Sequence, residues 1–196
     1  MTTLLPASPS RHATGRHRHP EETDHRPVLD RIARILLASA LAGGIVWMLV
    51  QAEAVRAAEA RLAAWWMNPW IPGGAAASDD VFMLWISENH LVGFQVTAEC
   101  TAIILIAPLL ALGACFTLST RVSRPRAVGA IVASAAVMVI VNQVRLALIG
   151  FSTLQGGLGA GYEFGHRFAG SAVGIAGFAI GLIILIAVAG VRRRRR

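Results

Sequence analysis

Apolar residues of this chain fall into long runs separated by short polar segments. Four runs stand out, and they cover residues 32–50, 98–118, 127–151 and 168–191. At a rise of roughly 1.5 Å per residue, each is about long enough to cross the hydrocarbon core of a bilayer. The pattern therefore predicts an all-α polytopic membrane protein with about four transmembrane helices.

The sequence between the first two runs is more polar. Residues 51–66 carry charges among alanines and end in tryptophans, which is typical of a helix that leaves the bilayer or lies on its surface. Proline and glycine at 69–74 then end that helix. Polar residues interrupt the apolar stretch 81–96, so we interpret this stretch as a re-entrant or interfacial segment.

Composition agrees with a membrane protein and divides the chain into three parts. Hydrophobic residues make up 55% of the sequence and charged residues only 15%. Residues 1–30 form a polar leader rich in Arg, His, Pro, Ser and Thr, which we expect to be disordered. Four histidines in the leader lack a scaffold or nearby carboxylate pattern, so neither a metal site nor a cofactor is expected. The transmembrane domain covers 31–191, and 192–196 form a basic tail.

The distribution of arginine predicts the orientation of the chain. The formal net charge is +7, and all 18 cationic residues are arginines. They cluster in the leader, in the 119–126 loop and in the tail, which four membrane crossings place on one side. The positive-inside rule makes that side, with both termini, cytoplasmic. Membrane orientation explains this clustering better than nucleic-acid binding, and a multi-pass protein of the plasma membrane is expected.

This topology brings three reactive residues to one face of the membrane. The second predicted helix begins at the outer face, the third ends there and the fourth begins there. Cys100, Arg145 and His166 lie near these three helix ends. A thiol, a guanidinium and an imidazole at one level suggest covalent catalysis.

Arg145 carries the strongest signal of the three. An ionisable residue inside an apolar helix indicates a functional site by default, and the alternative is an arginine that extends to the lipid headgroups. Asn142 precedes it by three residues, on the same helical face, where its amide could hold the guanidinium.

Cys100 and His166 have rivals of their own type. Cys100 is expected to begin the second helix, where the helix N-terminus would favour the thiolate, whereas Cys115 is interpreted as a packing residue. His166 follows a glycine-rich loop, 155–165, and opens the fourth helix as a neutral imidazole. His90 remains an alternative base. Glu99 and Glu163, at the same level, could orient the imidazole.

These residues resemble the ordered motifs of the exosortase/archaeosortase family of membrane transpeptidases. The resemblance covers roughly residues 30–191 and is carried by Cys100, by Asn142-Gln143-Val144-Arg145, and by His166 followed by Gly170. The common Cys-Ser-Gly of the family is Cys100-Thr101-Ala102 here, and the chain is short for the family.

The resemblance implies a cysteine transpeptidase that cleaves the C-terminal sorting signals of exported proteins. Its substrates would end in a short motif, a hydrophobic helix and a basic tail, and would pass through a thioester to an acceptor that the sequence does not identify. Besides lipid, these proteins are the expected partners, and nucleic acid is not. Two alternatives stay open: a membrane thiol protease with water as acceptor, and a non-enzymatic membrane component.

Overall fold

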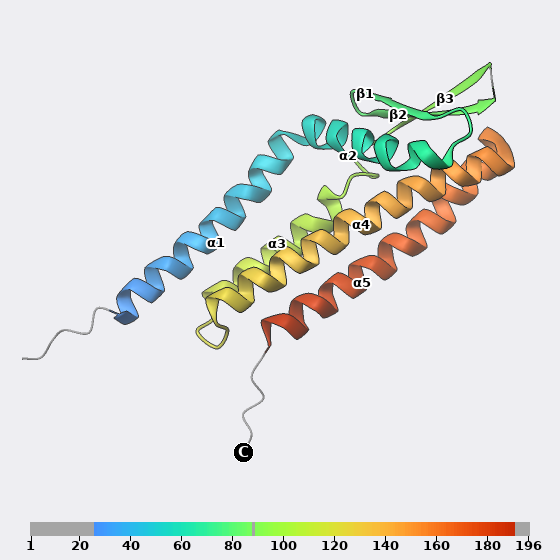
Figure 1. The fold of residues 1–196 in the computed structure, drawn as a ribbon. Helices are drawn as coiled ribbons and strands as arrows, with labels where there is room; N and C mark the ends of the chain where they lie inside the picture. Colours follow the sequence, from blue (N-terminus) through green and yellow to red (C-terminus); the bar gives the residue numbers. More distant parts are fainter. Residues whose placement is uncertain (1–25, 88, 191–196) are drawn as a thin grey trace, which may run out of the picture.

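The computed structural model describes residues 26–87 and 89–190, and the protein is mostly helical over that range (Figure 1). Most of the predicted leader and the basic tail therefore lie outside the described residues. Helices α1 (Arg26–Val50), α3 (Ile103–Leu118), α4 (Arg124–Gly156) and α5 (Gly170–Ala189) form a bundle. Within it α1 contacts α3, α3 contacts α4, and α4 contacts α5.

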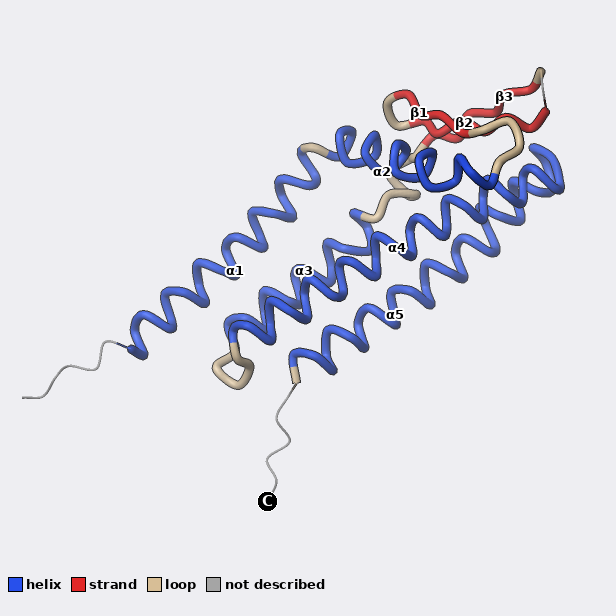
Figure 2. Tube along the Cα trace, viewed as in Figure 1, coloured by secondary structure: helices blue, strands red, loops and turns tan. Residues whose placement is uncertain are grey.

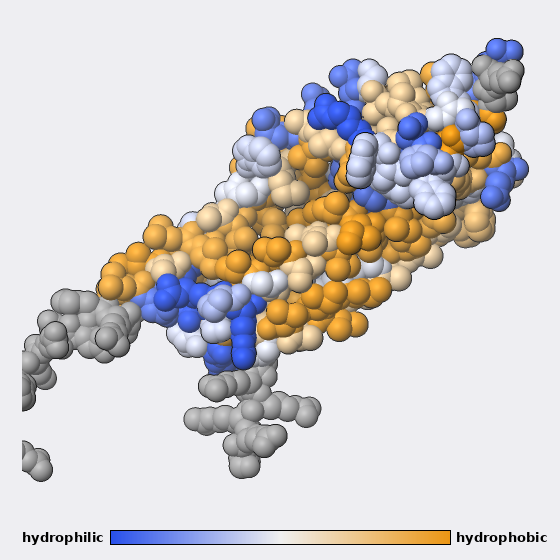
Figure 3. All heavy atoms as spheres, in the orientation of Figure 1, coloured by the Kyte–Doolittle hydropathy of each residue, from blue (hydrophilic) through white to orange (hydrophobic). Residues whose placement is uncertain are grey.

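Three helical segments of the described chain are long and apolar enough to cross a membrane: Val28–Val50, Arg124–Gly161 and Phe164–Ala189. Helix α3 is apolar but shorter, with 16 residues. Figure 3 shows the apolar surface of the bundle lying between a polar region at each end. The prediction of a mostly helical protein with long apolar helices is thus confirmed, and three of these helices could span a membrane.

Glycines bring α4 and α5 into close contact. Gly170, Gly174, Gly177 and Gly181 are all buried on one face of α5, as the sequence predicts. A Cβ at Gly177 would lie 2.3 Å from Cγ1 of Val141, so the two helices approach closely at this point. Small residues allow this kind of packing within a membrane.

Helix α2 (Ala52–Met67) lies across one end of the bundle, and a small sheet follows it (Figure 2). A short 3-10 turn, Asn68–Trp70, leads into strands β1 (Ala75–Ser78), β2 (Val81–Ser87) and β3 (His90–Gln95). The sheet is antiparallel in the order β1-β2-β3.

The sheet corrects the sequence prediction of an all-α fold, because the stretch 81–96, interpreted as a re-entrant or interfacial segment, forms strands β2 and β3. Phe82, Leu84 and Phe94 are buried in a core that they share with α2 and α4. Alternate residues point away from that core, as the pleat of a strand requires. The polar residues Ser87 and His90 are paired at the end of the β2–β3 ladder.

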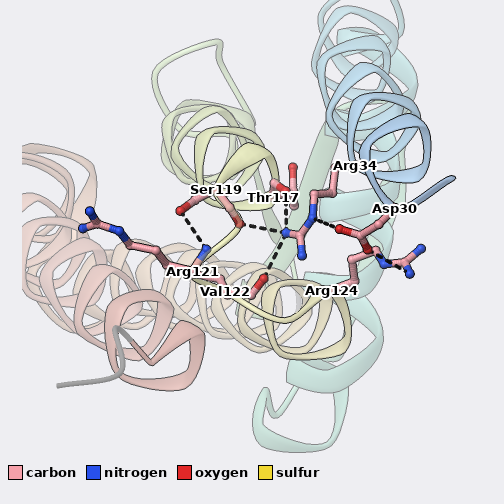
Figure 4. Close-up of polar contacts among 7 residues, drawn as sticks. All are labelled: Asp30, Arg34, Thr117, Ser119, Arg121, Val122 and Arg124. Atoms are coloured by element: carbon pink, nitrogen blue, oxygen red, sulfur yellow. Dashed lines mark hydrogen bonds and ion pairs between the residues drawn. The ribbon is translucent and has the colours of Figure 1, made fainter. Parts of the chain in front are cut away.

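At the opposite end of the bundle, Arg34 of α1 ties the α3–α4 loop in place (Figure 4). Its Nη1 donates hydrogen bonds to the carbonyl oxygens of Thr117, Ser119 and Val122, at 3.2, 2.7 and 3.0 Å. Its Nε pairs with Asp30 at 2.7 Å, and Asp30 also pairs with Arg124 at 3.0 Å. A cation at the C-terminal end of a helix such as α3 stabilises the otherwise unpaired carbonyls.

Candidate active site

Cys100 and His166 lie in direct contact at the end of the bundle that carries the sheet. The Sγ of Cys100 is 3.4 Å from Nε2 of His166, across 66 positions of sequence. Cys100 is 3% exposed and lies in the turn between β3 and α3, where its N–H bonds to the carbonyl of Thr97. The expectation that Cys100 begins a helix is therefore wrong, because α3 starts three residues later.

The segment that carries His166 is helical, whereas the sequence predicts a glycine-rich loop. Helix α4 ends at Gly156, and the chain reverses at Gly157, whose φ of 76° is in the left-handed region that favours glycine. Two π-helical stretches follow, Gly157–Gly161 and Phe164–Ala169. His166 is the third residue of the apolar helical segment Phe164–Ala189, so it lies in the first turn of the fourth predicted span. Single π-helical turns of this kind occur frequently at functional sites.

Glycines allow this segment to pack against the end of α4. A Cβ at Gly165 would lie 2.0 Å from Oγ of Ser152 and 2.9 Å from Cα of Ile149. A Cβ at Gly161 would lie 2.2 Å from the carbonyl oxygen of Ser152. Neither position has room for a larger residue, so the glycines set how deeply the His166 segment lies against α4.

A stack of aromatic rings fixes the orientation of the imidazole. The ring of His166 stacks on Tyr162, with centroids 5.4 Å apart and planes 13° apart. Tyr162 stacks on Phe94 of β3, and Phe94 stacks on Phe82 of β2. The sheet therefore supports the imidazole through three ring contacts. Sequence reasoning missed Tyr162, although its spacing of four residues from His166 is the spacing of neighbours on one helical face.

Arg145 connects the Cys100 turn with the start of α5. Its Nη1 donates a 2.9 Å hydrogen bond to the carbonyl oxygen of Glu99, the residue before Cys100. On its other side, a Cβ at Gly170 would lie 3.3 Å from Nε of Arg145. This Nε is buried and has no hydrogen-bond partner among the described residues, so a polar donor is left over at the site.

Asn142 does not hold the guanidinium, contrary to the sequence prediction. Its side chain is fully buried, and neither amide atom has a hydrogen-bond partner within the described part of the chain. The neighbouring Gln143 instead faces α2, where it accepts a 2.9 Å bond from Nε1 of Trp66 and donates to the carbonyl of Glu59. The i, i+3 spacing places Asn142 and Arg145 on the same face of α4. The long side chain of Arg145 nevertheless extends away from Asn142, to the carbonyl oxygen of Glu99.

Glu59 of α2 supports the Cys100 turn, and sequence reasoning missed it. It is 8% exposed, and its Oε1 accepts a 2.8 Å hydrogen bond from the N–H of Ala102. Its Oε2 is buried without a partner among the described residues. Burial raises the pKa of this carboxyl, and hydrogen bonds from Ala102 and Thr101 and the charge of Arg56 oppose the rise. The sequence feature that could have identified Glu59 is its place in an alanine-rich stretch, next to residues 60, 63 and 64, which are buried in the structure.

The Cys100–His166 pair opens into a pocket of about 420 Å³. Its wall includes Phe94, Gln95 and Thr97 from the sheet and the following turn, with Leu158 and Tyr162 on the opposite side. A pocket of this size, in which aromatic and aliphatic side chains alternate with polar groups, can hold a ligand. The thiol is therefore buried in the protein yet accessible to a ligand in the pocket.

The other polar candidates lie apart from this pair. His90 is exposed at the start of β3, next to the hairpin turn, and the pocket is lined by His166 and not by His90. Glu163 is exposed, and Glu99 contributes its backbone carbonyl. Neither carboxylate hydrogen-bonds His166 among the described residues. Cys115 is a free, exposed cysteine on α3.

The arrangement is that of a nucleophile and a base. A thiol beside an imidazole can transfer its proton to the ring and become a nucleophilic thiolate. Nε2 of His166 accepts this proton in the tautomer that carries its ring hydrogen on Nδ1. The described residues contain no group of three or more His, Cys, Asp or Glu side chains that could hold a metal ion.

Comparison with known proteins gives no match to this chain among family models, curated proteins or solved structures.

Proposed function

We propose that this protein is a membrane-embedded cysteine transpeptidase of the exosortase type. The observation that carries the proposal is the 3.4 Å contact between Cys100 and His166 at the wall of a pocket. The contact joins the two residues whose chemistry acyl transfer requires. Arg145, the third residue of the family motifs, is bonded to the backbone immediately before the nucleophile.

In the first half-reaction, His166 takes the thiol proton and the Cys100 thiolate attacks a peptide carbonyl of the substrate. The oxyanion that forms is stabilised by Arg145, whose buried Nε is an unused donor. When the tetrahedral intermediate collapses, the C–N bond breaks, His166 returns the proton to the leaving amine and a thioester remains on Cys100. A donor placed for such an oxyanion contributes about 3–4 kcal/mol in other acyl-transfer enzymes.

In the second half-reaction, an acceptor nucleophile attacks the thioester. His166 takes its proton, and the thiol of Cys100 is released as the leaving group. An amine or hydroxyl acceptor gives transfer, and water gives hydrolysis, so the alternative of a membrane thiol protease differs only in this step.

The free edge of β3 supports an extended substrate. The N–H of Val96 bonds to the carbonyl of Asp80, so alternate residues of β3 are hydrogen-bonded to β2. Gly93 and Gln95 fall at the intervening positions, where backbone groups point away from the partner strand. Both residues line the pocket, and β3 is the last strand of the sheet. A substrate strand paired with β3 would lead its carbonyl to Cys100.

The proposed topology has four membrane crossings, with α3 as the short one, and both termini in the cytoplasm. Six described arginines stand at the end opposite the site, at positions 26, 31, 34, 121, 124 and 126. The positive-inside rule then puts the site at the outer face of the plasma membrane. Exported proteins with a C-terminal motif, hydrophobic helix and basic tail are the proposed substrates, the helix lying beside the bundle.

The proposal is tested with an activity assay in membranes. A co-expressed reporter ends in a candidate sorting motif, an apolar helix and an arginine tail, chosen from the C-termini encoded by the same genome. We expect Cys100→Ala to abolish cleavage of the reporter, and His166→Ala to reduce it strongly, while Cys115→Ala cleaves normally. Normal cleavage by Cys100→Ala would refute the proposal and favour a non-enzymatic membrane component.

The mass of the released product separates transfer from hydrolysis. A new C-terminus carrying an added group indicates transfer to an acceptor, whereas a free carboxylate indicates a protease. Hydroxylamine releases acyl groups from thioesters, so it should also trap the acyl-enzyme as a hydroxamate product. A hydroxamate formed by the wild type and absent with Cys100→Ala identifies the thioester.

A further inference from the structure

A second pocket lies at the end of the bundle opposite Cys100. It has a volume of about 450 Å³ and is formed by Arg34 of α1, residues 120–123 of the α3–α4 loop, Arg126 of α4 and Gly190 after α5. The pocket therefore lies where four helices end. The candidate active site does not include it.

The lining of this pocket is cationic. Arg34, Arg121 and Arg126 contribute to its wall, and no carboxylate does so among the described residues. Asp30, the one described acidic residue at this end, is occupied by Arg34 and Arg124. Arg121 and Arg126 form no ion pair with any described residue. Figure 4 shows Arg121 extending away from the group of bonds around Arg34.

The backbone keeps this pocket in shape without a ligand. Arg34 is 9% exposed and holds the α3–α4 loop through three carbonyl oxygens. The loop places Arg121, and the first turn of α4 places Arg126, whose Nη1 would lie 3.9 Å from a Cβ at Gly190. The guanidinium groups thus belong to a fixed frame, although their ends are exposed to an incoming anion.

Apolar surface borders the pocket on the side of the membrane. Leu118 at the end of α3 is 52% exposed, and Ile186 and Val188 at the end of α5 are 46% and 43% exposed. A ligand that fits both regions combines an anionic group with hydrocarbon chains. Guanidinium groups bind phosphate through paired N–H donors, so the anion that they favour is a phosphate ester.

We propose that this pocket binds the phosphate of an anionic membrane lipid, with Arg121 and Arg126 as its principal ligands. The acyl chains lie along the exposed ends of α3 and α5. The bound lipid joins the α3–α4 loop to the end of α5, two segments that the described hydrogen bonds leave unconnected. This site is independent of the proposed transpeptidase activity.

Native mass spectrometry of the protein in a neutral detergent tests the site. The probes are phosphatidylglycerol and the zwitterionic phosphatidylcholine, added at increasing concentration. We expect the wild type to bind phosphatidylglycerol at least about tenfold more tightly than phosphatidylcholine. Arg121→Gln with Arg126→Gln should weaken phosphatidylglycerol binding about 30-fold, the factor that corresponds to about 1 kcal/mol for each arginine near a lipid surface.

The matched control removes two arginines from the other end, as Arg61→Gln with Arg167→Gln. An equal loss in the control would show a general charge effect and overturn the site. Equal retention of the two lipids by the wild type would also overturn it. Arg121→Lys with Arg126→Lys keeps the charges, so it should bind more tightly than the glutamine pair. If the glutamine pair does not fold, the lysine pair decides: phosphatidylglycerol binding that is weaker than in the wild type supports Arg121 and Arg126 as the ligands, and binding equal to the wild type refutes the need for their guanidinium groups.

Inorganic phosphate distinguishes a lipid from a free anion. We expect millimolar phosphate to leave the melting temperature of the wild type unchanged, because it lacks the apolar contacts, whereas phosphatidylglycerol raises it. Equal stabilisation by both would replace the lipid with a soluble phosphate as the ligand.

Discussion

The buried carboxyl of Glu59 allows the support of the Cys100 turn to be tested without any substrate. Its Oε1 accepts the N–H of Ala102, which is itself 3% exposed, so the donor has no access to solvent. Glu59→Ala leaves that donor unpaired, and an unsatisfied buried group costs about 1–3 kcal/mol. Glu59→Gln keeps an oxygen for the bond and removes the ionisable group. The two substitutions therefore separate the hydrogen bond from the charge.

The raised pKa of Glu59 gives the effect of pH a definite sign. Burial favours the protonated carboxyl in the folded protein, so the folded state binds more protons than the unfolded chain at intermediate pH. Glu59 contributes its full stabilisation of the folded wild type below the unfolded pKa of 4.5. This stabilisation is lost as pH rises through the higher pKa of the folded state. Glu59→Gln has no such loss. Its stability relative to the wild type should therefore increase from acidic to neutral pH.

Thermal unfolding of the purified protein, followed by tryptophan fluorescence from about pH 4.5 to about pH 8, measures both effects. A free energy of about 2 kcal/mol corresponds to roughly 4–8 °C for a protein of this size. We expect Glu59→Ala to melt lower by about that amount at acidic pH, and the difference to narrow as pH rises because this variant also lacks the ionisable group. Glu59→Gln should approach or exceed the wild type as pH rises. Glu53→Gln, at an exposed position of the same helix, is the matched control for loss of a carboxylate.

One result would refute this reasoning. If Glu59→Gln loses stability relative to the wild type as pH rises, the ionised carboxylate is favourable in the folded protein, and its attraction to Arg56 outweighs burial. A difference that does not vary with pH would mean that Glu59 binds its proton equally well in the folded and unfolded states, and the direction assigned to its pKa would be wrong.

Three further predictions concern the site itself. A membrane-impermeant thiol reagent applied to intact cells should modify Cys100 and spare Cys115, read by mass spectrometry of the peptides, and the reverse order would invert the proposed topology. Arg145→Lys should lower the cleavage rate of the reporter about 100-fold or more, since a point charge cannot replace a fork of donors; near-normal turnover would reduce Arg145 to a headgroup anchor. Gly165→Ala should abolish cleavage because its Cβ meets α4, whereas Gly159→Ala, with nothing within 4 Å, should cleave normally; equal activity of the pair would disprove the packing argument.

The long helices were predictable because each corresponds to one uninterrupted run of apolar residues in the sequence. A run of apolar residues long enough to cross a bilayer has few other solutions, and the glycines of α5 fall on one helical face. Counting those helices also placed Cys100 and His166 at one end, and the structure puts them 3.4 Å apart. That inference needed only the direction of each helix, which is a property of chain order.

The sheet was not predictable from the same signal. The residues of β2 are apolar on both faces, so the alternation of Phe82 and Leu84 with their neighbours does not appear as apolar and polar positions. The contacts of Glu59 and Arg145 were hidden for another reason. Each side chain hydrogen-bonds a backbone atom of a distant segment. Every residue except proline carries the same backbone groups, so the identity of the partner residue does not reveal such a bond.

The π-helical segment between Gly157 and Gly170 allows the direction of the His166 imidazole and the packing of α5 on α4 to be set separately. In a regular helix, one would determine the other. A π-helical turn contains more residues than an α-helical turn, so these stretches shift the angular position of what they carry relative to α5. Removing one residue between His166 and Gly170 would rotate the imidazole by about 100° while α5 stayed in its groove on α4. The number of residues in this segment, more than their identity, therefore sets the angle at which the base meets the thiol. Substitutions here can be absorbed where space allows, whereas a single insertion or deletion changes the geometry of the pair.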